Sequence, residues 1–230
     1  MILDKKRPLI ALPLDDTDLK EKLKIAKDKP IDIIELRIDQ FSSFDISYIL
    51  DLARLVKESG FYLLATVRSK EEGGADLPDE KRLNIFSEVV KLADILDIEL
   101  TSQKINKDVV KLAKENGKLS LVSYHDFEKT PSEEEIQEII DRSSSLGADI
   151  IKYAFRTNSV EDVGRILSVS HKNRDKNIVA IGMGETGKIT RVAGFFFGSL
   201  ITYTFIGRSF APGQIEVDKL VEEMKFYGLM

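Results

Sequence analysis

Short apolar runs rich in β-branched residues alternate with longer amphipathic segments along the chain. The runs, each typical of a buried strand, are PLIALPL, DIIELRID, FYLLATVR, ILDIEL, KLSLVSYH, DIIKYAF, NIVAIGMG and LITYTFI. Between them, apolar positions recur with helical spacing near residues 17–28, 46–59, 79–93, 104–116, 132–146, 159–172, 188–198 and 216–227. This alternation favours a parallel sheet covered by helices.

The spacing of the pattern indicates how that sheet closes. Successive units are about 29 residues apart, which is typical of a β/α repeat, and eight such units predict a (β/α)8 TIM barrel of the α/β class. A doubly wound open sheet is the structural alternative. Since no Pro/Ser-rich linker, composition shift or low-complexity tract divides the chain, we expect one catalytic domain over residues 1–230.

Composition narrows the classes of function. The chain has 230 residues, no cysteine, two histidines and a formal net charge of −5. The lack of cysteine excludes a disulfide scaffold, a thiolate metal site and a cysteine nucleophile. Two histidines leave little room for a polyhistidine metal site, and the acidic balance argues against a nucleic acid or an anionic membrane as partner.

The N-terminal segment does not resemble a secretory signal. Its charged residues precede only a six-residue apolar stretch, residues 9–14, and no small-residue cleavage site follows. No apolar run approaches the roughly 20 residues that a membrane helix needs. We therefore expect a cytoplasmic protein.

Polar residues interrupt the predicted strands with a common parity. They are Glu35, Arg37, Asp39, Thr66, Arg68, Asp97, Glu99, Ser123, His125 and Lys152. Residues of one parity point to one face of a strand, so these side chains enter the barrel if that face is the interior. Most lie near the carboxyl ends of the strands, where barrel enzymes build active sites.

Each of these residues, taken alone, also has a structural explanation. Lys152 could reach solvent from an outward position, and His125 could be a hydrogen-bonded core residue. Glu35 and Arg37 could form a structural ion pair. His171, in the polar stretch SVSHKNRDK, is expected at a solvated helix end. The combination favours chemistry, because inward charges are costly to bury unless they are paired.

The residue types are suited to carbonyl chemistry. Lys152 has apolar neighbours in DIIKYAF, and desolvation favours its neutral amine, which can attack a ketone and form an imine. His125 could then move protons at the neighbouring carbon, with a carboxylate such as Glu72 to orient it. Arginines would hold an anionic part of the substrate. These residues predict a Schiff-base enzyme that needs no metal.

Seven motifs carry a resemblance to a known family. They are IELRID (34–39), TVRSKEEGG (66–74), DIEL (97–100), SYHDF (123–127), DIIKYAF (149–155), IGMGETGKITR (181–191) and APGQI (211–215). In this order and spacing, over essentially the whole chain, the sequence resembles type I 3-dehydroquinate dehydratase. That family of lyases catalyses the third step of the shikimate pathway to chorismate and the aromatic amino acids.

The resemblance implies a role for each matched residue. Lys152 would form a Schiff base with the C3 ketone of 3-dehydroquinate. His125, partnered by Glu72, would act as general acid and base in a syn elimination of water that gives 3-dehydroshikimate. Arg191 would hold the substrate carboxylate. The further substrate-binding residues implied are Glu35, Arg37, Arg68, Gln214, Met183, Tyr203 and Phe210. No cofactor or metal is implied, and the expected state is a homodimer.

The loop SFAPGQ departs from the family pattern, which usually reads serine-alanine-proline-glycine-glutamine. Here Phe210 takes the place of the serine, and Ser209 lies one position earlier. We expect a mobile lid that follows the last strand, with a backbone N–H in place of the missing hydroxyl. The alternative is an ordinary Pro-Gly turn.

Two other functions stay open from the residues alone. A class I aldolase would also use a barrel lysine, and Gly182, Gly184 and Gly187 could cradle its phosphate. A non-catalytic barrel that binds a metabolite is the other. Arg191 itself could be a helix-surface residue.

Overall fold

The computed structural model describes Leu3 and residues 7–230. Residues 1–2 and 4–6 lie outside the described residues. They form part of the N-terminal segment that, by its sequence, does not resemble a secretory signal. Within the described part of the chain, every helix is too short or too polar to cross a membrane.

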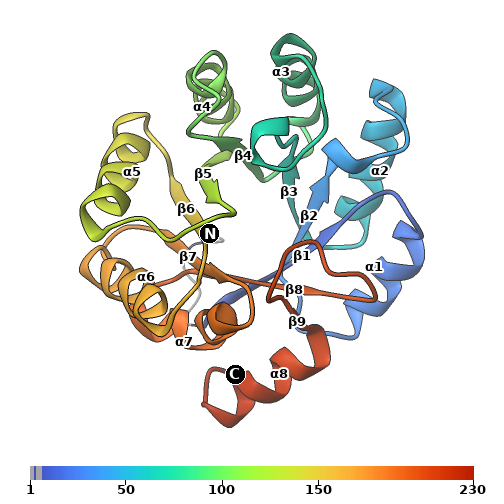
Figure 1. The fold of residues 1–230 in the computed structure, drawn as a ribbon. Helices are drawn as coiled ribbons and strands as arrows, with labels where there is room; N and C mark the ends of the chain where they lie inside the picture. Colours follow the sequence, from blue (N-terminus) through green and yellow to red (C-terminus); the bar gives the residue numbers. More distant parts are fainter. Residues whose placement is uncertain (1–2, 4–6) are drawn as a thin grey trace.

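Strands and helices alternate in chain order (Figure 1). The strands are β1 (Leu9–Leu14), β2 (Ile33–Arg37), β3 (Tyr62–Thr66), β4 (Ile95–Glu99), β5 (Leu119–Asp126), β6 (Ile150–Arg156), β7 (Ile178–Met183), β8 (Ile201–Phe205) and β9 (Ile215–Glu216). The α-helices are α1 (Leu19–Lys27), α2 (Ile46–Glu58), α3 (Asp79–Val89), α4 (Asn106–Glu115), α5 (Glu133–Ser145), α6 (Val160–Lys172), α7 (Thr190–Ala193) and α8 (Val217–Phe226). Short 3₁₀ turns are η2 (Ile38–Gln40), η3 (Lys70–Glu72), η4 (Thr186–Ile189) and η5 (Gly194–Phe197).

The strands form one curled parallel sheet in the order β7-β6-β5-β4-β3-β2-β1-β8-β9. Its two sides meet where Ile178 of β7 bridges Ser199, and the Leu200 N–H donates to the Ile178 carbonyl at 2.7 Å. Figure 1 shows the helices as an outer ring around this sheet. The predicted barrel is confirmed, and the open doubly wound sheet is wrong.

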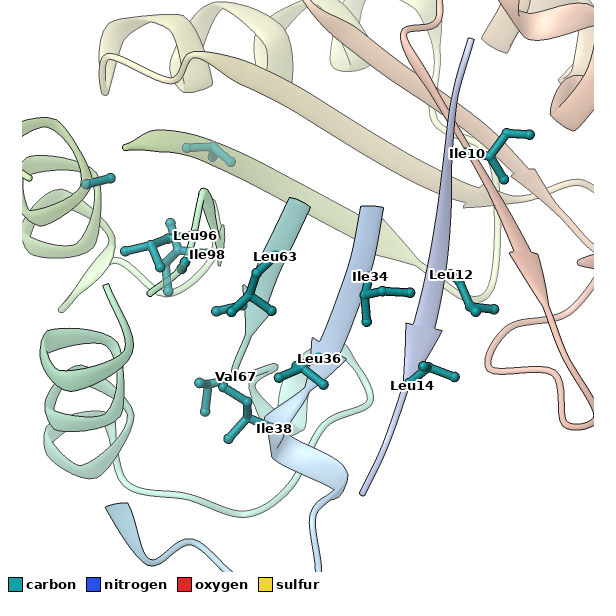
Figure 2. Packing of buried hydrophobic residues seen from close by; sticks show 14 of the residues in the cluster. Ile10, Leu12, Leu14, Ile34, Leu36, Ile38, Leu63, Val67, Leu96 and Ile98 are labelled. Atoms are coloured by element: carbon teal, nitrogen blue, oxygen red, sulfur yellow. The ribbon is translucent and has the colours of Figure 1, made fainter. Parts of the chain in front are cut away.

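The outward faces of the strands form the larger core. Leu12, Ile34, Leu63 and Leu96 come from four neighbouring strands and are fully buried against the helices (Figure 2). Because helices cover the outside of a parallel sheet, this face is continuously apolar.

The barrel interior is layered. Its lower layer is apolar and includes Ile33, Leu64, Ile95, Leu121 and Ile150. Two positions further along each strand, the inward residue is polar; these residues are Glu35, Thr66, Asp97, Ser123 and Lys152. Strand register sets them side by side, as in the Thr66–Asp97 and Ser123–Lys152 pairs. The predicted inward parity is therefore confirmed, and it gives the barrel an apolar floor beneath a polar rim.

The predicted helix over residues 188–198 is wrong in its form. The segment divides into η4, the short helix α7 and η5. Gly194 packs closely here, since a Cβ on it would lie 3.3 Å from the Ser199 Cβ. The Thr190 hydroxyl donates to the Gly187 carbonyl at 2.8 Å and accepts from the Gly182 N–H at 2.9 Å. These contacts tie the segment to β7 in short turns.

Two strands are shorter than their apolar runs. β3 ends at Thr66, so Arg68 lies beyond it, and Asp39 lies in η2 rather than in β2. Both side chains are nonetheless buried at the rim. A further strand, β9, was not predicted; it pairs with β8 after the loop that the sequence indicates as a lid.

Candidate active site

A cavity of about 160 Å³ opens among the carboxyl ends of the strands. It is lined by Lys152, His125, Glu72, Glu35, Arg37, Arg68, Arg191, Gln214, Met183, Tyr203 and Phe210. These are all of the site residues that the sequence proposes. The loop of residues 206–214, here called the lid loop, contributes Phe210, Ala211 and Gln214 to its wall.

Lys152 projects from β6 into this cavity and is 5% exposed. Its Nζ lies 3.6 Å from Asp97 Oδ2 and 4.4 Å from the ring centroid of Tyr203. Burial lowers the pKa of Lys152, and the charges of Glu35 and Asp97 offset part of that shift. The neutral amine is therefore easier to reach than on a surface lysine.

His125 and Glu72 form a close pair. His125 Nδ1 lies 2.8 Å from Glu72 Oε2, which also accepts the His125 backbone N–H at 3.1 Å. Burial lowers the pKa of His125 well below its usual range, and the charges of Arg68 and Lys152 act in the same direction. The imidazole is thus neutral at neutral pH, and with Nδ1–H on Glu72 its Nε2 is free to take a proton.

Glu72 sits in η3, the 3₁₀ turn that follows β3. Burial raises the pKa of its carboxyl group to about 7, although the Arg68 charge and a hydrogen bond from Thr101 oppose that rise. The Thr101 hydroxyl donates to Glu72 Oε1. The partner of His125 therefore changes charge close to neutral pH.

Arg68 is fully engaged with carboxylates beneath the cavity. Its guanidinium donates to Asp97 Oδ2 at 2.8 Å, to Glu99 Oε1 at 3.0 Å and to the Ser123 hydroxyl at 2.7 Å. Burial would raise the pKa of Asp97, but the charges of Arg68 and Lys152 outweigh it and hold the pKa well below its usual range.

Arg82 extends this network from helix α3. It is 1% exposed, donates to Glu99 Oε2 and also donates to the Val67 carbonyl at 2.9 Å and the Ser102 hydroxyl at 3.0 Å. One buried carboxylate, Glu99, thus joins two arginines.

The two residues of the ELR motif have separate partners. Arg37 donates from Nε and Nη2 to the carboxylate of Asp39 at 3.0 and 2.7 Å. Glu35 accepts the Thr66 hydroxyl at 2.7 Å through Oε1. No direct ion pair joins Glu35 to Arg37 among the described residues, so the structural pairing considered for them is wrong.

Arg191 lies in α7 on the other side of the cavity. It is 5% exposed, and no carboxylate among the described residues lies within ion-pair distance of it. Its Nε donates to the Gly213 carbonyl at 3.1 Å, while its Nη2 is buried without a partner. Burial lowers the pKa of Arg191 to about 10, so it keeps its charge at neutral pH. The helix-surface alternative for this residue is wrong.

The side chain of Gln214 holds the lid loop together. Its Oε1 accepts the Phe210 N–H at 2.7 Å, the Ala211 N–H at 3.3 Å and the Ser209 hydroxyl at 3.1 Å. From the sequence we expect a backbone N–H of this loop to replace the missing hydroxyl; those of Phe210 and Ala211 already donate to Gln214.

Three residues with a part in the site were not singled out from the sequence. Thr101 lies two residues after the end of β4, and Phe127 stacks on His125 with ring centroids 6.2 Å apart. Both follow carboxyl ends of strands, so the rule that found the other residues could have found them. Arg82 lies on a helix and carried no such signal.

The second histidine lies away from the cavity. His171 is exposed in the last turn of α6, where its Nε2 lies 2.9 Å from Arg174 Nη1. The solvated helix-end position predicted for it is confirmed.

The glycine-rich turn does not form an open phosphate cradle. The Gly182 N–H donates to the Thr190 hydroxyl and the Gly184 N–H to the Pro212 carbonyl, at 2.9 and 3.3 Å. Two of the amides that an aldolase phosphate would need are thus occupied. Among the described residues, no group of histidine, aspartate and glutamate side chains is arranged to hold a metal ion.

A buried lysine, a histidine–carboxylate pair and an unneutralised arginine thus share one cavity at the carboxyl end of a parallel barrel. Fold and site together define an α/β-barrel enzyme that acts on a small molecule. The chain belongs to the type I 3-dehydroquinase family, whose model matches residues 10–229. This membership overturns both the aldolase and the non-catalytic alternatives.

Individual relatives agree with the family match. The 3-dehydroquinate dehydratase of Aquifex aeolicus is 43% identical over 96% of this chain and 100% of its own length. Its crystal structure superposes with a TM-score of 0.89 at 42% identity, over 95% of this chain and 98% of that one. The Clostridium difficile enzyme, solved with covalent modified comenic acid, has a TM-score of 0.91 at 30% identity, over 98% and 94% of the two chains.

Proposed function

We propose that this 3-dehydroquinate dehydratase works through a Schiff base on Lys152 and a syn elimination of water. The observation that carries the proposal is that Lys152 and the His125–Glu72 pair line one cavity. A covalent ligand in the Clostridium difficile relative is consistent with a nucleophile in such a site.

The first stage is imine formation. The neutral amine of Lys152 adds to the C3 ketone of 3-dehydroquinate, and the carbinolamine loses water to give a protonated imine. Burial favours the uncharged amine beforehand. Asp97 Oδ2, 3.6 Å from Nζ, stabilises the positive charge that the imine carries afterwards.

The second stage is proton transfer at the adjacent carbon. The free Nε2 of His125 takes a proton from C2, whose electrons flow toward the protonated imine. The same imidazole returns that proton to the C1 hydroxyl, which departs as water from the same face. Hydrolysis of the imine then releases 3-dehydroshikimate and restores Lys152. Glu72 holds the imidazole in the required orientation throughout.

The remaining cavity residues bind the substrate in this proposal. Arg191, which has no carboxylate partner among the described residues, takes the substrate carboxylate. Glu35 accepts substrate hydroxyl groups. The other proposed contacts come from Arg37, Arg68, Gln214, Met183, Tyr203 and Phe210.

The experiment follows the conjugated enone of the product by ultraviolet absorbance when enzyme meets 3-dehydroquinate. A parallel sample receives borohydride, and the reduced adduct is mapped by peptide mass spectrometry. We expect turnover in the presence of a strong chelator and an adduct on Lys152. Turnover with the adduct on another residue, or with none, contradicts the Schiff-base mechanism.

The wider setting is also a proposal. Residues 1–230 act as a single catalytic domain, as a homodimer in the cytoplasm, without a cofactor. The match of one family model over residues 10–229 supports the single domain, and the homodimer is what the family resemblance implies. Analytical ultracentrifugation of the active enzyme tests the oligomeric state.

A further inference from the structure

Two hydrogen-bonding atoms on residues that line the cavity are buried and have no partner among the described residues. They are Nη2 of Arg191 and the hydroxyl of Tyr203, on residues that are 5% and 3% exposed. Buried polar atoms in native proteins almost always have partners, so an orphaned pair in a cavity marks a place where a ligand supplies the acceptors.

The two groups lie on neighbouring elements. The Thr202 hydroxyl donates to the Arg191 carbonyl at 2.7 Å, which holds the start of β8 against α7. Burial raises the pKa of Tyr203 well above its usual range; the charges of Glu35 and Asp97 add to that rise, and those of Arg68 and Arg191 oppose it. The phenol therefore stays protonated and can donate.

Several other donors around the cavity are already engaged. The lid N–H groups of Phe210 and Ala211 donate to Gln214. Arg37 is paired with Asp39, and Arg68 with Asp97 and Glu99. Arg191 Nη2 and the Tyr203 hydroxyl are thus the buried donors on cavity-lining residues that have no partner among the described residues, which makes them candidates to bind an anion.

We propose that the Tyr203 hydroxyl is a second ligand of the substrate carboxylate and donates to one carboxylate oxygen while Arg191 binds the other. This inference rests on the proposed function, since it takes the carboxylate of 3-dehydroquinate as the anion. The ring of Tyr203 also lies 4.4 Å from Lys152 Nζ. One side chain therefore touches both the nitrogen that receives the ketone and the subsite that receives the carboxylate, and it selects substrates with that spacing.

The test variant is Tyr203→Phe, which keeps the ring beside Lys152 and removes only the hydroxyl. We expect KM for 3-dehydroquinate to rise about tenfold or more, because a hydrogen bond to a charged group is lost. Quinate, the 3-hydroxy counterpart of the substrate, and its carboxamide serve as probes that cannot form an imine. The wild type is expected to prefer the carboxylate, and Tyr203→Phe to lose most of that preference.

Thermal unfolding separates ligand binding from a structural role. The Tyr203 hydroxyl has no partner among the described protein groups, so Tyr203→Phe should leave Tm unchanged or raise it, yet reduce the rise in Tm that quinate produces. The matched control is Tyr153→Phe on β6, whose buried hydroxyl donates to the Ile166 carbonyl at 3.2 Å. That variant should lower the ligand-free Tm and keep the full quinate effect.

A combined variant tests whether both groups hold one carboxylate. If they do, Tyr203→Phe should weaken quinate binding less in an Arg191→Lys background than in the wild type. Equal effects in both backgrounds, or a carboxylate preference of Tyr203→Phe within twofold of wild type, would overturn the Tyr203 assignment. An inactive wild type would instead refute the proposed function, while the quinate measurements still report on Tyr203.

Discussion

Two sets of buried residues at the cavity differ in how their polar groups are paired. The paired wall consists of Arg68, which lines the cavity, and of Arg82, Asp97 and Glu99 beneath it, and each of its charged groups has at least two partners. The unpaired wall consists of Arg191 and Tyr203, each with a buried polar atom that has no partner in the described part of the chain.

The difference separates structural charge from functional charge. A buried ion that is fully hydrogen-bonded holds its neighbours in place, and removing one partner leaves the other as an uncompensated buried charge. A buried ion with no opposite charge beside it weakens the ligand-free protein and is compensated when a ligand of opposite charge binds. Substitutions in the paired wall should therefore lower stability, and substitutions in the unpaired wall should lower substrate binding.

Lys152 lies between the two walls, so its loss should have the largest effect. Its Nζ contacts Asp97 of the paired wall and the Tyr203 ring of the unpaired wall. Lys152→Ala should reduce kcat by at least about a thousandfold, because the covalent route is removed. Steady-state rates measure this, with Lys111→Ala on the surface of α4 as a control. A loss of less than tenfold would contradict the imine.

Arg191→Ala breaks the unpaired wall. We expect kcat/KM for 3-dehydroquinate to fall by the equivalent of roughly 2–5 kcal/mol, with little change in Tm. Arg191→Lys should recover part of the loss, since lysine cannot donate two parallel hydrogen bonds. If Arg191→Ala stays within about threefold of wild type, less than 1 kcal/mol, then the carboxylate is held elsewhere.

Arg82→Met breaks the paired wall at its deepest point. The change leaves Glu99 buried with one arginine fewer, and we expect the free energy of unfolding to drop by about 3 kcal/mol. Denaturant titration measures it. Arg54→Met removes an exposed arginine that is paired with Asp51 on α2, and should cost less than about 1 kcal/mol. Equal losses in the two variants would remove the distinction between the walls.

The His125–Glu72 pair belongs to neither wall and gives the reaction its pH dependence. Burial raises the pKa of Glu72 to about 7, and the carboxylate form is the one that accepts Nδ1–H. The rate should therefore fall about tenfold per unit as pH drops below that value. Thr101→Val removes a hydrogen bond that favours the carboxylate, so it should move this acidic limb of the pH–rate profile to higher pH. Glu72→Gln should abolish the acidic limb. If that limb persists in Glu72→Gln, it reports the titration of another group.

Phe210→Ser should produce the smallest effect, because it only adds a donor near the unpaired wall. The Phe210 side chain lines the cavity and its N–H is held by Gln214. In an Arg191→Lys background we expect Phe210→Ser to raise kcat/KM a few-fold, and Phe210→Ala, which lacks the hydroxyl, to give no gain. Matching gains from both variants would mean that space, rather than a hydroxyl, is what the lid supplies.

Much of this arrangement could be predicted from the chain. Strand parity placed Glu35 and Lys152 on the inner face, because alternation in a strand fixes direction without knowledge of the fold. The barrel followed from the repeated unit. Arg82 could not be found this way. Its neighbour in the same helix, Lys81, is also a basic residue with the same sequence signal, but its side chain is exposed.

The sequence also does not reveal which buried donors find hydrogen-bond partners. Arg68 has partners that lie 29 to 55 positions further along the chain, whereas Tyr203 has none for its hydroxyl. Both outcomes depend on distances between elements that packing sets to fractions of an ångström. The division of residues 188–198 into short turns has the same origin, because close contacts of Gly194 override its neighbours' helical spacing.

The seat of the lid loop is a contact between two backbones. Gly213 adopts a φ of +76°, and a Cβ on it would lie 2.4 Å from the Gly184 carbonyl oxygen. The Gly184 N–H in turn donates to the Pro212 carbonyl at 3.3 Å. If the loop acts as the predicted lid, we expect the close approach of these two main-chain segments to set how long a product stays beneath it. Gly213→Ala would add a methyl group that pushes the two backbones apart. We expect it to shorten that dwell time while every reacting group stays in place.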